Sequence, residues 1–401
     1  MQGAGTSHEE RGKGEQDERS DHAVSRRRAR WKPEMSAARG IVSVGVIGTG
    51  SIGTDHVRRL AWTLAGARVH SVFDVDSARA GAVADEVGAQ ARASAHAVIE
   101  DEAVDAVLVA SADESHAEMV LACIDAGKPV LCEKPLAPTV PESMQVLAAE
   151  QAGGRLLVQV GFMRRYDDGF RALKSAVETG AIGQPVTSHC VHRNASSPAG
   201  FTSAMSFTSS VIHEIDTMRW LLCEEIAAVT VVQTRTSPLA PEGLRDPQLV
   251  LLETESGIVI DVEVFVNCRY GYDVRAELVG SLGAISIDEP SASTLAAQGA
   301  RRRVVVADWR DRFASAYRVE VQEWVRAVQL HLGTPGGQPG TPGGRPGTPG
   351  GRPVAAGAAT AWDGYAATAV AEAATAALET GARQQVELGP RPPFYATARS
   401  I

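Results

Sequence analysis

The chain has 401 residues, 44% of them hydrophobic, and a formal net charge of −9 at pH 7. This length is enough for two domains with ordinary cores, and the acidic balance argues against a dedicated nucleic-acid-binding protein. No apolar run approaches the roughly 18 residues that a membrane-spanning helix needs. The five cysteines are scattered and form no C-x-x-C pair. We therefore expect reduced, buried thiols in a cytoplasmic protein, with no disulfide framework and no metal site.

Two segments are expected to lie outside the folded domains. Residues 1–39 are polar and charged, which predicts a disordered tail without a signal peptide. The run "SRRRARWK" within it could be a nucleic-acid or nuclear-targeting patch, but such runs are usually solvated tails. Residues 333–353 consist of three near-identical heptapeptides rich in Gly and Pro. They cannot sustain a helix or a strand ladder, so we expect a flexible loop without a function.

The remaining sequence predicts an α/β fold with two domains. Over residues 40–160, apolar runs such as "VSVGVIG" and "VDAVLVAS" alternate with helix-like stretches, which predicts a parallel, doubly wound Rossmann domain. From about residue 183 to 286 the predicted strands have no full-length helices between them, and "ESG" and "SLG" resemble hairpin turns. This pattern predicts an α+β domain, over 161–332 and 354–401, with an open, mostly antiparallel sheet.

A glycine motif follows the first predicted strand. Gly48, Gly50 and Gly53 form G-x-G-x-x-G at the start of a predicted helix, where backbone N–H groups can bind a dinucleotide pyrophosphate. The motif alone is weak, because an ordinary glycine-rich turn often produces it. Asp74 ends the second predicted strand, where a carboxylate accepts hydrogen bonds from a ribose 2′-hydroxyl and repels a 2′-phosphate. Since Val75 and Asp76 offer no arginine, we expect NAD in preference to NADP.

Two further stretches carry polar residues suited to chemistry. "LCEKPLAP" ends a predicted strand, so Glu133 and Lys134 would face the cofactor, and the lysine could stabilise charge that develops on a substrate oxygen. A surface Glu-Lys-Pro turn is the alternative. In "TSSVIHEID", a helix would carry Ser209, His213 and Asp216 on one face. A catalytic histidine usually contacts a carboxylate, yet one turn before His213 the chain has only a serine.

Together these motifs resemble the Gfo/Idh/MocA oxidoreductase family and, more narrowly, the bacterial inositol 2-dehydrogenases within it. The narrower resemblance depends on "VGFMRRYD", "HCVHRN", "DPQLVLLET", "VNCRYGYD" and "AWDGY". The similarity covers roughly residues 41–332, resumes at "TAWDGY" (360–365) and runs close to the C-terminus. The tail and the Gly/Pro repeat lie outside it.

The resemblance implies NAD as the cofactor and a polyol ring lying on the antiparallel sheet. Lys134 would hold the reacting hydroxyl, and His213 would be the base. The residues lining the ring would be Arg164, His192, Asn194, Ser209 and Tyr272. The cofactor would be bound by Gly48, Gly50, Ser51, Ile52, Gly53, Asp74, Ser111, His116, Glu133 and Lys134. The resemblance also implies a homo-oligomer, a tetramer, with neither nucleic acid nor membrane as a partner.

The residues alone favour a plainer interpretation of part of this site. His189 and His192 would be ordinary sheet residues, and Arg164 or Arg165 would pair with Asp167 or Asp168. With the resemblance, the substrate-binding interpretation is favoured.

The chain departs from the family pattern at Ser209, where the family has an aspartate. Asp216 is a poor substitute, because the family has an acid there as well. The enzyme would therefore work with a weaker relay, prefer a different polyol isomer, or have lost activity. The expected function is NAD-dependent oxidation of myo-inositol at carbon 2 to an inosose. The alternatives are a dehydrogenase for another inositol isomer or a pyranose, and a non-catalytic NAD or sugar sensor.

Overall fold

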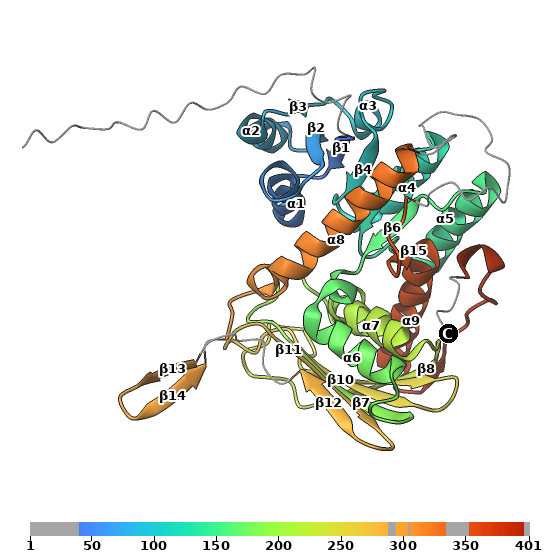
Figure 1. The fold of residues 1–401 in the computed structure, drawn as a ribbon. Coiled ribbons are helices and arrows are strands. Elements are labelled where there is room, and N and C mark those ends of the chain that lie inside the picture. Colours follow the sequence, from blue (N-terminus) through green and yellow to red (C-terminus); the bar gives the residue numbers. More distant parts are fainter. Residues whose placement is uncertain (1–39, 288–293, 304, 334–352, 397–401) are drawn as a thin grey trace, which may run out of the picture. The chain divides into compact units, whose positions relative to one another are not determined.

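The computed structural model describes residues 40–287, 294–303, 305–333 and 353–396 (Figure 1). The tail expected over 1–39 and nearly all of the repeat expected over 333–353 lie outside the described residues.

The first sheet is parallel apart from one short strand, which confirms the predicted Rossmann domain. Its order is β15-β6-β5-β4-β1-β2-β3. The strands are β1 (Val42–Ile47), β2 (Ala67–Phe73), β3 (Gln90–Ala91), β4 (Ala106–Val109), β5 (Val130–Glu133), β6 (Val158–Gly161) and β15 (Ala359–Thr360). All six residues of β1 are buried, as a continuous apolar run predicts for a central strand covered on both faces. β1 lies between β4 and β2, so the carboxyl end of β1 is at the point where the strand order reverses.

Helices cover this sheet, and one of them comes from the C-terminal half of the chain. They are α1 (Ser51–Trp62), α2 (Ser77–Val87), α3 (Ala95–Ile99), η2 (Asp113–Ser115), α4 (His116–Asp125), α5 (Val140–Gly153) and α8 (Trp309–Leu332). Val321, Trp324 and Val328 of α8 pack in one core with Val44 and Val57. Both α8 and β15 therefore complete the first domain, although the expected boundaries placed them in the second.

The second sheet has the order β12-β11-β7-β10-β9-β8-β16. The strands are β7 (Pro185–Arg193), β8 (Ile226–Gln233), β9 (Gln248–Thr254), β10 (Val259–Phe265), β11 (Asp273–Gly280), β12 (Ala284–Ile287) and β16 (Gln384–Gln385). All neighbours pair antiparallel except β7 and β10. This confirms the predicted open, mostly antiparallel sheet. The hairpins predicted at "ESG" and "SLG" join β9 to β10 and β11 to β12.

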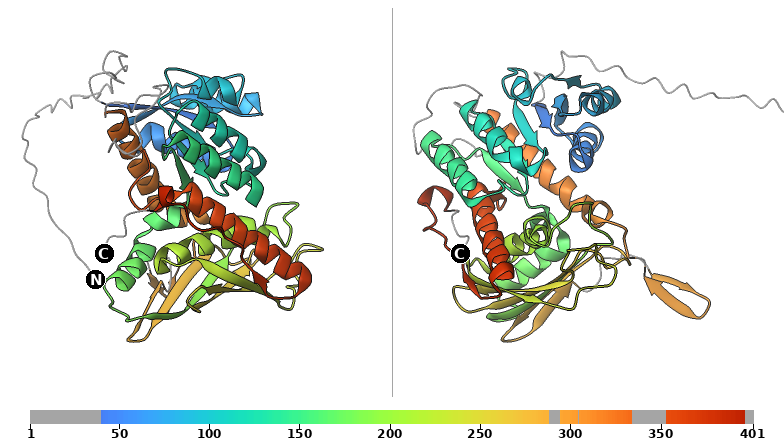
Figure 2. Two further views of the ribbon diagram at one scale, coloured as in Figure 1. Left: turned by 90° about the vertical axis from the view of Figure 1, so that its right-hand side faces the viewer. Right: turned by 180° about the vertical axis from the view of Figure 1, so that it is seen from behind.

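Helices lie on one face of the second sheet only, among the described residues (Figures 1 and 2). They are α6 (Asp168–Glu178), α7 (Ile212–Leu222) and α9 (Ala361–Thr380), with the single turn η3 (Met163–Tyr166). The turn η5 (Pro393–Tyr395) instead contacts α5, where the Tyr395 hydroxyl lies 2.8 Å from Glu150 Oε2. A separate hairpin consists of β13 (Thr294–Ala297) and β14 (Ala300–Arg303). Burial alternates along β9 and β10, as expected for a sheet with one face packed on a core.

The helix expected over 208–216 is not regular. Residues Ser206–Val211 form a π-helical turn, η4, and the α-helix α7 begins only at Ile212. In a π turn the hydrogen bonds join residues five apart instead of four. The prediction that Ser209, His213 and Asp216 share one α-helical face is therefore wrong.

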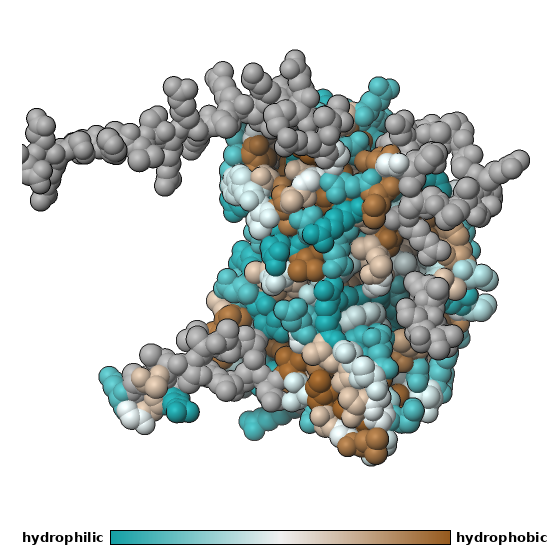
Figure 3. Space-filling model, viewed as in Figure 1, coloured by the Kyte–Doolittle hydropathy of each residue, from teal (hydrophilic) through white to brown (hydrophobic). Residues whose placement is uncertain are grey.

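The burial of the cysteines agrees only in part with the expectation of buried thiols. Cys123, Cys132 and Cys190 are buried as expected, but Cys223 is exposed and Cys268 is half-buried. No helix among the described residues is long and apolar enough to cross a membrane. On the face in Figure 3, hydrophobic residues are interspersed with hydrophilic ones.

Candidate active site

The glycine motif forms a tight turn at the carboxyl end of β1. Gly48 has φ +92°, and a Cβ there would lie 2.4 Å from the carbonyl oxygen of Ala110. A Cβ on Gly53 would lie 2.0 Å from the carbonyl oxygen of Gly48. Next to Gly50, by contrast, a Cβ would meet nothing within 4 Å. The outer glycines are thus required by packing, whereas Gly50 leaves room for a group to approach the backbone.

Helix α1 begins at this turn with its N–H groups free of side-chain caps. Its N-cap is Gly50, which makes no side-chain hydrogen bond, and its first turn contains no acidic residue. By comparison, α2, α5 and α6 are capped by Asp76, Thr139 and Asp167. An uncapped helix N-terminus offers N–H donors to an anion, so this turn, with Ser51 and Ile52 in it, suits a dinucleotide pyrophosphate.

Asp74 follows β2 and is fixed by several donors. Its carboxylate accepts hydrogen bonds from the backbone N–H of Thr49 at 2.7 Å and of Asp76 at 2.9 Å, and from Arg79 Nη2 at 2.6 Å. Burial alone would raise the pKa of Asp74, but the hydrogen bonds from Arg79, Asp76 and Thr49 lower it to about 2. The carboxylate is therefore ionised at neutral pH. Residues 75 and 76 contain no arginine, but α2 supplies one, Arg79, at this carboxylate.

Glu133 lies in a buried chain of polar groups. His56 Nε2 lies 2.7 Å from Glu133 Oε1, and Arg59 Nη1 donates to His56 Nδ1 at 3.0 Å. Because Nδ1 accepts from the arginine, the ring proton is on Nε2 and is donated to the carboxylate. The Glu133 side chain thus anchors the end of β5.

The turn after β5 is held from a second side by His116. His116 Nδ1 lies 2.6 Å from the carbonyl oxygen of Pro135, and His116 Nε2 lies 3.2 Å from that of Ser111. These contacts connect the ends of β4 and β5, where Ser111 and Lys134 stand.

Lys134 is half-buried and reaches the second domain. Its Nζ donates to the backbone carbonyl of Ser209 at 3.2 Å, and its charge acts on His213. The structure therefore brings the two expected catalytic residues together across the two sheets.

His213 is buried and lacks a carboxylate partner. Its Nδ1 has no hydrogen-bond partner among the described residues, and its ring lies edge-to-face on Phe162 with centroids 6.2 Å apart. Burial lowers the pKa of His213 well below its usual value, and the positive charges of Arg164 and Lys134 lower it further. The ring is therefore neutral at pH 7 and able to accept a proton.

Glu214, next to His213, organises the residues around it. It forms an ion pair with Arg164, and both of its carboxylate oxygens lie 3.0 Å from His192 Nδ1. Arg164 Nη2 lies 3.1 Å from the same nitrogen, so Glu214 and Arg164 together hold the His192 ring in place. The Tyr272 ring lies edge-on to His192 with centroids 6.0 Å apart. Four of the expected residues, Arg164, His192, His213 and Tyr272, thus form one cluster.

Asn194 follows β7, two residues after His192. Its Oδ1 is buried without a partner among the described residues, as are Arg164 Nε and His213 Nδ1. Buried polar atoms are normally hydrogen-bonded, so three unpartnered atoms on expected site residues indicate a place where a polar ligand completes the bonding.

The plainer expectation for the arginines is wrong. Arg164 pairs with Glu214, and Arg165 pairs with Asp216 and Asp363. Asp216 is therefore committed to Arg165 and not to His213. Asp167 instead caps α6 and pairs with Arg312. His189 does lie on the outer face of the sheet, paired with Asp261.

Sequence reasoning missed four residues that shape the site: His56, Arg79, Glu214 and Asp363. A signal was present for Glu214, because ten of the eleven residues of α7 are buried and charged residues are almost never buried without a partner. Within the described residues, no group of His, Cys, Asp or Glu is arranged to hold a metal ion.

Comparisons with known proteins agree with this geometry. A model described as an oxidoreductase family with an NAD-binding Rossmann fold matches residues 42–162, and the GFO/IDH/MocA C-terminal domain matches residues 170–286. The fold and the glycine turn define an oxidoreductase with an NAD-binding domain.

Relatives of high identity narrow this class. Inositol 2-dehydrogenase 3 of Saccharopolyspora erythraea is 50% identical over 287 residues, which cover 72% of this chain and 85% of the relative. An inositol 2-dehydrogenase of Pseudomonas syringae is 47% identical over 72% of this chain and 86% of its own length. The chain belongs to the Gfo/Idh/MocA oxidoreductase family, as the sequence motifs predicted.

A solved structure is also similar. The myo-inositol dehydrogenase of Lactobacillus casei, crystallised with NAD(H) and myo-inositol, aligns with a TM-score of 0.81 at 34% identity. The alignment covers 89% of this chain and all of that one. The predicted NAD-binding Rossmann domain and the second, mostly antiparallel domain are thus confirmed.

Proposed function

We propose that the protein oxidises a secondary ring hydroxyl of a cyclitol with NAD, and that the substrate is myo-inositol, oxidised at carbon 2 to the inosose. The observation that carries this proposal is the approach of Lys134 to a neutral, buried His213 beside the NAD-binding domain. The inositol 2-dehydrogenase relatives support the choice of substrate.

His213 and Lys134 have different roles in the proposed proton transfer. His213 accepts the proton of the reacting hydroxyl, for which its unprotonated state at neutral pH is required. Lys134 Nζ hydrogen-bonds the same oxygen and stabilises the negative charge that develops there. NAD, when bound, supplies the acceptor for the hydride that leaves the ring carbon. The pyrophosphate of NAD would be held by the residues of the glycine turn, namely Gly48, Gly50, Ser51, Ile52 and Gly53.

The remaining residues suit an uncharged, hydroxyl-rich ring. A polyol offers no charge and no large apolar face, so recognition depends on many hydrogen bonds. Asn194 Oδ1 supplies an acceptor, His192 supplies a ring nitrogen, and Tyr272 supplies a hydroxyl. Arg164 and Glu214 fix His192 from behind. Ser209 lies four residues before His213 in sequence, and its backbone carbonyl accepts a hydrogen bond from Lys134 Nζ.

Initial rates with purified protein test this proposal directly. NADH absorbance should appear with myo-inositol, and more slowly or not at all with scyllo-inositol, D-chiro-inositol and D-glucose. Faster turnover of another ring would favour the different-isomer alternative, to which the substitution at Ser209 points. Binding of NADH without turnover of any polyol would favour the sensor and refute the dehydrogenase proposal.

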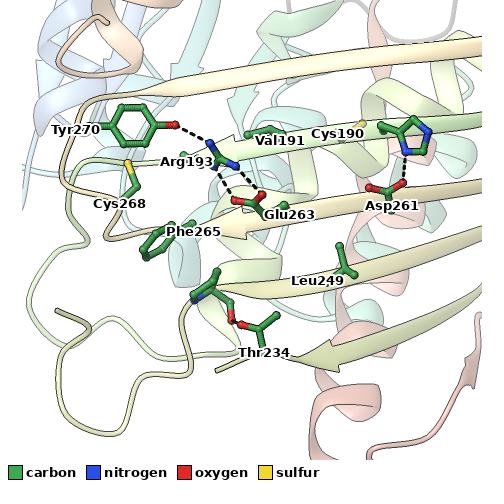
Figure 4. A pocket seen from close by; sticks show the side chains of 12 residues that line it. Cys190, Val191, Arg193, Thr234, Leu249, Asp261, Glu263, Phe265, Cys268 and Tyr270 are labelled. Carbon is green, nitrogen blue, oxygen red and sulfur yellow. Dashed lines mark hydrogen bonds and ion pairs between the residues drawn. The ribbon is translucent and has the colours of Figure 1, made fainter. Parts of the chain in front are cut away.

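We also propose that the protein is a cytoplasmic homo-oligomer, a tetramer by family resemblance. The support is the outer face of the second sheet, where no described helix packs (Figure 2). Figure 4 shows this face, with ion pairs between Arg193 and Glu263 and between His189 and Asp261. The same face carries half-buried apolar side chains, namely Val191, Leu249, Leu251 and Phe265. Charges neutralised within the chain beside apolar side chains suit contact with a second copy.

A further inference from the structure

Arg79, on the first turn of α2, covers the carboxylate expected to recognise the cofactor ribose. Its Nη2 lies 2.6 Å from Asp74 Oδ1 and its Nε 3.2 Å from Asp74 Oδ2. A third nitrogen, Nη1, lies 3.5 Å from Asp76. The guanidinium thus binds Asp74 through two hydrogen bonds at once.

With Arg79 in place, Asp74 has no acceptor left. Oδ2 also accepts from Thr49 N at 2.7 Å and Thr49 Oγ1 at 3.0 Å, and Oδ1 accepts from Asp76 N at 2.9 Å. A carboxylate offers about four lone-pair sites, and five donors already lie on this one. Ribose hydroxyls can bind Asp74 only where a donor leaves.

Arg79 is the donor able to leave. Its side chain is 44% exposed, whereas that of Asp74 is 5% exposed. Two of the other donors are the backbone N–H groups of Thr49 and Asp76, and the third is the hydroxyl of Thr49, which is fully buried. Ion pairs with an exposed partner contribute little net stability, so displacing the guanidinium is inexpensive. A released guanidinium would remain beside the N-terminus of α2, which also favours negative charge.

We propose that Arg79 is a cofactor-specificity residue that weakens the discrimination of Asp74 against NADP. The inference rests on the proposed dinucleotide function. An NAD ribose must displace Arg79 from Asp74, whereas a 2′-phosphate gains a bidentate partner from it. NAD remains the better cofactor, because Asp74 and Asp76 carry two negative charges against the one positive charge of Arg79.

Binding and turnover of both cofactors in Arg79→Ala test the proposal. Dissociation constants for NADH and NADPH, from the fluorescence of the reduced nicotinamide, give a readout that does not depend on polyol turnover. NADPH binding should weaken by about three- to tenfold through loss of charge-assisted hydrogen bonds. NADH binding should tighten by up to about fivefold, because Arg79 no longer competes with the ribose hydroxyls for Asp74. The ratio of kcat/KM for NAD to that for NADP should rise in parallel.

Arg58→Ala is the matched control, since Arg58 is also an exposed arginine of the first domain and is paired with Glu86 at 2.9 Å. It should leave the ratio of the two dissociation constants unchanged. An unchanged ratio in Arg79→Ala, or an equal change in Arg58→Ala, overturns the proposal. If the ratio shifts but no polyol is oxidised, the specificity role stands and the dehydrogenase proposal fails. If neither dinucleotide binds the unaltered protein, both fail.

Discussion

His213 is held without the negative partner that normally steadies a catalytic histidine. Arg164 and Lys134 place positive charge near it, and burial acts in the same direction on its pKa. The nearby carboxylate, Glu214, is already shared by Arg164 and His192. The ring is consequently unprotonated at neutral pH and holds a proton weakly once it has accepted one. A weak hold favours release of that proton after each turnover and makes proton abstraction itself harder.

We expect Lys134→Ala and His213→Ala each to lower kcat by about 10²–10⁴-fold, because a positioned general base or charge-stabilising group contributes that much. NADH binding should persist in both variants, since the glycine turn is untouched. Arg383→Ala, at a side chain that is 45% exposed and pairs with Glu253, serves as the control and should keep full activity. Activity of His213→Ala near that of the unaltered protein would show that another group is the base.

Ser209→Asp should raise kcat on myo-inositol by up to about tenfold, part of what a well-oriented base contributes. A negative charge at position 209, four residues before His213, would favour the imidazolium and so raise the depressed pKa of this histidine. The acidic limb of the pH–rate profile should therefore move to higher pH. The variant should gain most at its pH optimum and lose relatively more at low pH. Ser209→Asn, which is similar in size but neutral, should leave the limb where it is.

Complete loss of myo-inositol turnover in Ser209→Asp, with NADH binding intact, would contradict the weakened-relay interpretation. It would indicate that the serine makes room for a different ring. Screening the same variant against other inositol isomers distinguishes the weakened-relay interpretation from the different-isomer interpretation.

At the scale of elements, the sequence was most informative where burial follows a simple period. Continuous apolar runs located β1 and β5, and the turn "ESG" located the hairpin of β9 and β10. The π turn of η4 left no such signal, because small and apolar residues suit both helix types. Membership of α8 in the first core could not be predicted either, since an amphipathic helix does not specify which sheet it packs on. The expected catalytic pair was found through motifs. Glu214 contacts Arg164, which is distant in sequence, and Arg79 reaches Asp74 across the turn between β2 and α2.

Helix α7 is buried on nearly all sides, so its charged residues depend on their partners. Asp216→Asn should destabilise the protein by about 3 kcal/mol, near the lower end for a broken buried pair, because Asp363 still contacts Arg165 at 3.2 Å. Urea unfolding measures this. Glu253→Gln removes an exposed partner of Arg383 and should cost less than about 1 kcal/mol. Equal effects of the two substitutions would show that Asp216 is not held as described.

At the scale of the whole molecule, the outer face of the second sheet is the surface that we expect to contact a second copy of the chain. A stable interface buries roughly 1,200–2,000 Å² in total, and a single apolar side chain near its centre can control association. Leu251 is half-buried on this face, between neighbouring strands β8 and β10. Because it does not point into the core, it can be changed without opening a cavity.

Leu251→Arg should therefore dissociate the oligomer, because a charged side chain would be buried without a partner at each interface. Light scattering coupled to gel filtration gives the mass of each species. Leu330→Arg, at a position that is 69% exposed on α8, should keep the mass of the unaltered protein. Circular dichroism must show that both variants are folded. A monomeric unaltered protein, or a Leu251→Arg variant of unchanged mass, would rule out association through this face. Retained NADH binding in the dissociated variant would show that each copy carries its own cofactor site.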